Sequence, residues 1–152
     1  MPHESKSSPR EIQAYLGRIS GPLLDRIDLH VEVPPVKFTE MRDARPGETS
    51  AVVRQRVIAA REIQRLRFAH KPRITCNARM GSNEMKQFCA LDASTAELLK
   101  HAMTDLNLSA RAYDRVLRVA RTIADLSGSQ QILADHMGEA IQYRSLDRRL
   151  WG

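Results

Sequence analysis

The chain has 152 residues, of which 42% are hydrophobic and only 5% aromatic, and it carries a net charge of +6 at pH 7. This length allows one domain with a real core, or a small domain with a tail, and the composition suits helices better than a β-sandwich. Because no apolar run reaches the ~18 residues of a membrane span and the N-terminus lacks the apolar stretch of a signal peptide, we expect a soluble, cytoplasmic protein without a membrane partner.

Residues 1–46 predict only short regular elements. Apolar side chains recur at helical spacing up to residue 19, and further on they alternate with polar ones, as in a β-strand. The expected elements are a helix over Glu11–Ile19, a turn over Leu23–Ile27 and a strand over Leu29–Val33 that Pro34 and Pro35 end. Prolines and mixed charges occupy residues 34–47, so we place a domain boundary after residue 46.

Residues 47–152 predict a helical domain. Asp92 and Ser109 stand where an N-cap side chain would accept a hydrogen bond from the first turn of a helix. Gly128 is placed to end a helix in the left-handed conformation. The expected helices are Ser50–Ala69 with Thr49 or Ser50 as cap, a short helix within Gly81–Leu91, one from Asp92 to Leu106, one from Ser109 to Leu126, and a last one over Leu133–Ser145.

The positive charge is confined to the helical domain. Residues 1–46 carry seven basic and seven acidic side chains, whereas residues 47–152 carry 17 and 11. Eight basic residues and one acid, Glu62, lie between Arg54 and Arg79, and the helical spacing aligns Arg54, Arg61 and Arg65 on one face. This pattern indicates a track for DNA. A solvated helix flank is the alternative, because no aromatic side chains alternate with the basic ones for base stacking.

The cysteines and histidines do not form a metal-binding pattern. Cys76 and Cys89 lie thirteen residues apart, and no histidine stands three or four residues from another His or Cys on an evident helix face. We therefore expect no metal ligands and two reduced, structural thiols.

One segment carries a specific resemblance. The run from Ser20 to Pro34 reads Ser-Gly-Pro-Leu-Leu-Asp-Arg-Ile-Asp-Leu-His-Val-Glu-Val-Pro. It resembles, nearly letter for letter, a signature of the magnesium-chelatase-like AAA+ ATPases of the ComM/YifB group. The later block Leu108–Leu126 resembles the C-terminal lid of the same family, and the two blocks stand in the expected order. With the stretch Glu48–Arg61, the resemblance covers roughly residues 9–150.

The resemblance implies roles for individual arginines at an ATP site. It implies that Arg26 is the catalytic arginine finger and that Arg111 is the lid arginine called sensor 2. Arg115 or Arg118, on the same face of the helix as Arg111, would add supporting contacts to the nucleotide. A guanidinium suits this task because it is always charged and directs two donors toward phosphate oxygens.

Each of these roles has a structural alternative. Arg26 would instead pair with Asp25 or Asp28 at a helix end. Arg115 and Arg118 would pair with Asp114 or Asp125.

Other parts of an ATPase are missing from the chain. None of the seven glycines belongs to a Gly-x-x-x-x-Gly-Lys-Ser/Thr loop, and no acidic pair ends an apolar strand as a Walker B motif does. We therefore expect a fragment that is inactive alone and binds no cofactor, with ATP and Mg²⁺ bound only in a full-length parent. The expected fold is mainly α, with a helical lid bundle over residues 47–152 after a detached core segment, residues 1–46, with one nominal strand.

Three uses of such a chain remain open. The first is a homo-hexameric DNA helicase or branch-migration motor, in which neighbouring subunits are the partners. The second is the motor subunit of a true magnesium chelatase, which drives metal insertion into a porphyrin. The third is a stand-alone basic module that binds nucleic acid without ATP.

Overall fold

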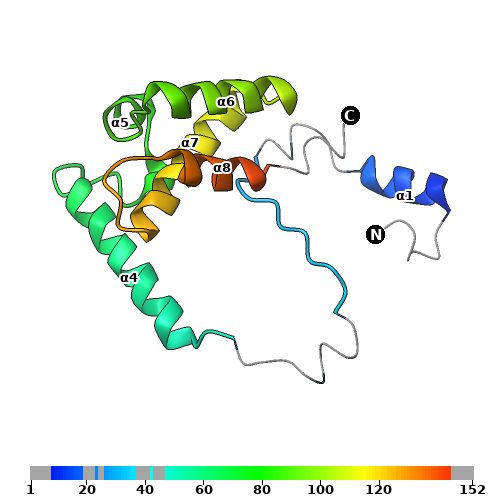
Figure 1. Ribbon diagram of the computed structural model, residues 1–152, viewed down its shortest axis with the longest axis horizontal. Helices are drawn as coiled ribbons and strands as arrows, with labels where there is room; N and C mark the ends of the chain where they lie inside the picture. The colour runs from blue at the N-terminus through cyan, green and yellow to red at the C-terminus, as the bar shows by residue number, and fades with distance from the viewer. Residues whose placement is uncertain (1–7, 19–22, 24–25, 37–41, 43–46, 145–152) are drawn as a thin grey trace.

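The computed structural model describes residues 8–18, 23, 26–36, 42 and 47–144 (Figure 1). In these residues the chain is mainly helical, which confirms the predicted fold class, and it contains no strand. None of the described helices is long and apolar enough to cross a membrane. The elements in chain order are α1 (Pro9–Leu16), α4 (Ser50–Arg67), the 3-10 turn η2 (Asn77–Arg79), α5 (Ser82–Phe88), α6 (Ala93–Asp105), α7 (Ala110–Leu126) and α8 (Ala134–Gln142).

The helix starts follow from local capping. The side chains of Thr49, Asp92 and Ser109 accept hydrogen bonds from backbone N–H groups three residues on, at 3.5, 2.7 and 3.2 Å. Each bond satisfies one of the donors that a helix start leaves free. Helix α7 ends where Gly128 takes a φ of 70°, a left-handed conformation that favours glycine. The predicted caps and this helix end are confirmed.

The predicted strand over Leu29–Val33 is not formed. These residues are irregular chain, and the side chains of Val31 and Val33 are 65% and 83% exposed. A strand needs a neighbour to pair its peptide groups, and no described residue offers one. The predicted last helix, Leu133–Ser145, extends too far, because α8 ends at Gln142 and a turn follows over residues 143–144. The domain boundary predicted after residue 46 lies outside the described residues.

Helix α7 is the centre of the bundle. It packs against α8, α4, η2 and α5, and α6 packs against α8. Its Ala112, Val116, Ala120 and Ala124 recur every four residues and are all buried. Small side chains at this spacing let neighbouring helices approach closely. Figure 1 shows α4 running away from the other helices toward its N-terminal end.

A buried carboxylate links the elements around α7. Asp125 accepts hydrogen bonds from the Arg67 guanidinium at 2.7 and 2.5 Å, from Asn77 Nδ2 at 2.8 Å and from Arg121 Nε at 3.1 Å. Arg121 also donates to the carbonyl oxygens of Gln130 and Ser129, at 2.8 and 2.5 Å. Desolvation by burial lowers the pKa of Arg121, and the charge of Asp125 opposes this shift. This cluster joins α4, η2, α7 and the loop before α8.

We predict that Asp125→Asn destabilises the chain strongly. Arg67 and Arg121 would keep their charges in a buried place without the opposite charge, which costs about 3–5 kcal/mol. Urea unfolding measures the loss. Asp105→Asn, at an exposed site at the end of α6, is the matched control and should change stability by less than about 0.5 kcal/mol. Equal, small losses in both variants would contradict the structural role of Asp125.

We also predict that the two free thiols differ in reactivity. Burial raises the pKa of Cys89 to about 11, whereas Cys76 is partly exposed. The thiolate is the reactive form, so Cys89 should be alkylated at pH 8 on the order of a hundred times more slowly than an ordinary thiol. Peptide mapping after timed iodoacetamide treatment measures both rates. Fast labelling of Cys89 in the folded chain would show that this part of the core opens.

Candidate functional site

Three of the arginines predicted for the ATP site, Arg111, Arg115 and Arg118, lie on the face of α7 away from the core. Because the buried side chains of α7 recur every four residues along one face, Arg111, Arg115 and Arg118 align on another. The structure gives these three arginines different surroundings.

Arg111 is exposed in the first turn of α7 and makes no hydrogen bond or ion pair in the described part of the chain. Arg115 forms an ion pair with Asp28, and the two side chains are 25% and 51% exposed. Arg118 is partly buried and donates from Nη2 to the carbonyl oxygen of Met80 at 2.9 Å. Of the three, Arg111 therefore has the guanidinium most open to a ligand.

The alternative partners predicted for these arginines were wrong. Asp125 is occupied by Arg67 and Arg121 in the core. The partner of Arg115 is Asp28, which lies 87 positions away in the sequence. Spacing along a helix finds partners on that helix and cannot find one brought close by the fold.

Arg26 lies beside this contact without sharing it. It is exposed, and its backbone N–H donates to the carbonyl oxygen of Leu23 at 3.0 Å, which closes a turn. Of its two predicted alternative partners, Asp28 pairs with Arg115 instead, and Asp25 lies outside the described residues. Its guanidinium forms no ion pair with a described residue. No contact in the described part of the chain joins Arg26 to Arg111. Asp28, two residues after Arg26, pairs with Arg115, four residues after Arg111.

Residues Ile27–His30 are bonded to the bundle at three points. Besides the ion pair of Asp28, the Arg144 guanidinium donates to the Ile27 carbonyl oxygen at 2.5 Å, and the His30 N–H donates to the Tyr143 carbonyl oxygen at 2.9 Å. Arg144 and His30 are both buried. Residues Ile27–His30 are therefore attached to α7 and to the residues just after α8.

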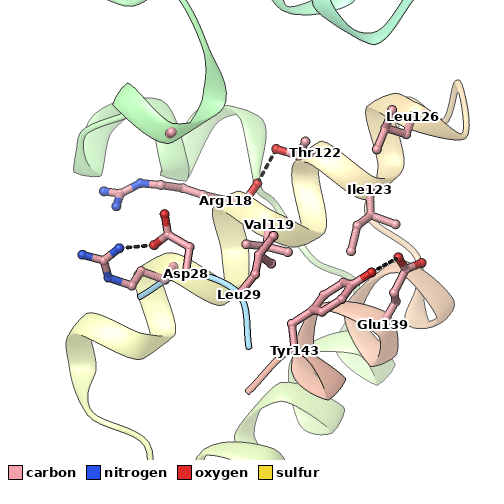
Figure 2. A pocket seen from close by; sticks show the side chains of 11 residues that line it. Asp28, Leu29, Arg118, Val119, Thr122, Ile123, Leu126, Glu139 and Tyr143 are labelled. Carbon is pink, nitrogen blue, oxygen red and sulfur yellow. Dashed lines mark hydrogen bonds and ion pairs between the residues drawn. The ribbon is translucent and has the colours of Figure 1, made fainter. Parts of the chain in front are cut away.

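A pocket of about 410 Å³ lies between this segment and helices α7 and α8. Figure 2 shows the apolar side chains of Leu29, Val119 and Ile123 together with the polar pair of Tyr143 and Glu139. The Tyr143 hydroxyl donates to Glu139 at 3.2 Å, and the negative charge of Glu139 raises the pKa of Tyr143. The remaining lining residues are Asp28, Ala78, Arg115, Arg118, Thr122 and Leu126.

Half of the eight basic residues in the predicted track form ion pairs within the fold. Arg67 is buried against Asp125. Three other basic residues, Arg56, Arg65 and Lys71, pair with Glu48, Glu62 and Glu84 at 2.6, 2.6 and 2.7 Å. Only part of the track therefore keeps an uncompensated positive charge.

The sequence analysis missed the residues that attach Ile27–His30 to the bundle and the partners that surround Asp125 in the core. The sequence does contain a hint of the pair of Arg121 and Asp125. These charged residues stand four residues apart on the buried side of α7, where charged residues are uncommon. For Asp28, Tyr143 and Arg144 we find no such signal, since their contacts join distant parts of the chain.

Two family models match the chain. One, described as magnesium chelatase, subunit ChlI C-terminal, matches residues 47–144, and another, described as magnesium chelatase, subunit ChlI, matches residues 1–41. The chain is 44% identical over 147 residues to the competence protein ComM of Haemophilus influenzae, which covers 96% of this chain and 28% of that protein. It is 43% identical over 149 residues to the uncharacterised protein YifB of Escherichia coli, with 97% and 28% covered. The chain thus spans about a quarter of the length of these relatives.

Proposed function

Because the chain belongs to the magnesium-chelatase-like family, we propose that it supplies arginine side chains to an ATP site between the subunits of a AAA+ motor. In this proposal Arg26 is the arginine finger and Arg111 is sensor 2. The phosphate-binding loop and the ligands of Mg²⁺ come from an ATPase core, since residues 1–152 contain no Walker A motif. The chain therefore completes a site that it does not form alone.

The free state of Arg26 and Arg111 is the observation that carries the proposal. An arginine that stabilises charge on a γ-phosphate has to be available before the nucleotide arrives. Both guanidiniums are exposed and without ion pairs among the described residues, whereas Arg67 and Arg121 are neutralised by Asp125. Other exposed arginines, such as Arg54, Arg73 and Arg79, also lack an ion pair among the described residues, so the family resemblance selects Arg26 and Arg111 from this larger set.

The position of Arg111 adds a second argument. It stands in the first turn of the 17-residue helix α7, where backbone N–H groups and the helix dipole favour an anion. A phosphate near this end would meet both the helix and the guanidinium. Arg115 could add its charge only if its ion pair with Asp28 opened, so its predicted contact with nucleotide is secondary in this proposal.

We infer the substrate of the motor from the names of the similar proteins and family models. The match to a competence protein favours DNA over a porphyrin, although the family models take their description from magnesium chelatase. We therefore propose a homo-hexameric DNA helicase or branch-migration motor, with neighbouring subunits as partners. A stand-alone nucleic-acid module is less well supported, because ion pairs already compensate half of the eight basic residues between Arg54 and Arg79.

The chain alone is expected neither to hydrolyse ATP nor to bind Mg-ATP tightly. Without a phosphate-cradling loop, two exposed arginines offer only weak, salt-screened attraction. Isothermal titration with Mg-ATP checks this. Micromolar affinity would mean that the chain holds a complete nucleotide site, and the proposal of a shared site would be wrong.

In the complete motor, Arg26→Ala should lower kcat by roughly 10³-fold or more with nucleotide binding nearly intact, because a finger acts mainly on the transition state. Arg111→Ala should lower turnover and also weaken binding or assembly, since a lid arginine meets the nucleotide before the chemistry. Steady-state kinetics and nucleotide titrations measure both effects. Lys86→Ala, at an exposed cation on α5, is the control and should change neither.

Mixed hexamers give the sharper test of the finger. Subunits with Arg26→Ala are combined with subunits that lack a working Walker A loop. Interfaces that pair a native finger with an intact loop can form in such mixtures, so partial activity should return. If no activity returns while light scattering confirms hexamers, Arg26 does not act across the interface.

A further inference from the structure

The contact between Asp28 and Arg115 joins the two segments that carry the proposed ATP-site arginines. Asp28 lies two residues after Arg26, so their Cα atoms are at most about 7 Å apart. Arg115 lies four residues after Arg111, one helical turn and about 6 Å along α7. The ion pair is therefore within four residues of Arg26 along the segment and of Arg111 along α7.

The surrounding contacts make this junction more than a surface ion pair. An isolated pair with these exposures, 25% and 51%, would hold a loop only weakly. Here the backbones of Ile27 and His30, close to Asp28 in the sequence, also form hydrogen bonds to the bundle. Arg144 binds the Ile27 carbonyl oxygen at 2.5 Å, and the His30 N–H binds the Tyr143 carbonyl oxygen at 2.9 Å. The segment is thus fixed to α7 through a side chain and to the end of α8 through the backbone.

The local geometry limits how Arg26 can move relative to this junction. The Arg26 N–H closes a turn onto Leu23 at 3.0 Å, so the backbone just before Asp28 is itself constrained. Asp28, labelled in Figure 2, lines the pocket between the segment and helices α7 and α8. Arg115 lines the same pocket. A shift of α7 would pull on Asp28, and Asp28 would carry Arg26 with it.

We propose that Asp28 and Arg115 are positioning residues, and that their ion pair, here called the latch, holds the segment from Arg26 to His30 against helix α7. The nucleotide that Arg111 contacts then sets the position of the Arg26 guanidinium. This inference rests on the proposed function. The latch itself is a property of the chain that can be measured without ATP. Neither residue touches the nucleotide in this role. They act on catalysis only through the placement of Arg26.

The first experiment measures the latch in the 152-residue chain by hydrogen exchange at the His30 amide. Asp28→Arg and Arg115→Asp each replace attraction with repulsion and should speed this exchange roughly three- to tenfold. The double variant restores opposite charges and should return the rate to within about twofold of the native chain. Lys86→Asp, an equal charge change on exposed α5, should leave it unchanged. Unchanged exchange in both single variants, or a double variant as fast as they are, would overturn the latch.

The second experiment measures the consequence in the complete motor. Asp28→Arg should lower kcat roughly tenfold with KM for ATP within about twofold of native, and the Asp28→Arg/Arg115→Asp double variant should recover most of the loss. Asp28→Asn, a milder change at a half-exposed site, should give a smaller loss in the same direction. A fall in kcat that the double variant does not recover would overturn the positioning role.

The two proposals fail in different ways. If Arg26→Ala leaves turnover intact, the proposed finger is wrong whatever the exchange at His30 shows. If Arg26→Ala abolishes turnover while Asp28→Arg leaves kcat native, the finger stands and the positioning role of Asp28 is wrong.

Discussion

The buried carboxylate of Asp125 is the constraint on which the rest of the bundle depends. Its bonds to Arg67, Asn77 and Arg121 join α4 and η2 to α7, and Arg121 extends the connection to the loop before α8. Apolar contacts alone would let helices built from Ala, Val and Leu slide along one another. Sliding α7 along its neighbours would separate the buried charge of Asp125 from those of Arg67 and Arg121, so this cluster favours the observed packing.

The packing of α7 against its neighbours decides which of its arginines form contacts within the fold. Once α7 is fixed with its alanine face inward, Arg121 is used in the core, Arg118 binds the carbonyl oxygen of Met80, and Arg111 faces solvent at the helix start. In the same packing, Arg115 pairs with Asp28, and the His30 N–H donates to the carbonyl oxygen of Tyr143, just after α8. The function that we propose uses two arginines that have no ion pair among the described residues, Arg111 on α7 and Arg26 in the segment before it.

Local features of the fold could be predicted from the sequence, and contacts between distant residues could not. The caps Asp92 and Ser109 and the exit at Gly128 depend on side chains within a few residues and were predicted, and Thr49 was one of the two caps predicted for α4. The strand at Leu29–Val33 was predicted from alternation alone and fails, because pairing needs a neighbour that the alternation does not supply. The attachment of Ile27–His30 escaped prediction for a similar reason, since its partners lie on α7 and just after α8, more than eighty residues further along the chain. The site arginines came from a resemblance, and the structure adds their surroundings.

The most direct test of the account is a structure of the complete motor bound to a non-hydrolysable ATP analogue. We predict that the Arg26 guanidinium of one subunit lies within hydrogen-bond distance of the γ-phosphate held by its neighbour, that Arg111 lies at a nucleotide phosphate, and that Asp28 and Arg115 remain paired. Arg26 paired with a carboxylate of its own subunit, with no arginine of the neighbouring chain at the γ-phosphate, would contradict it.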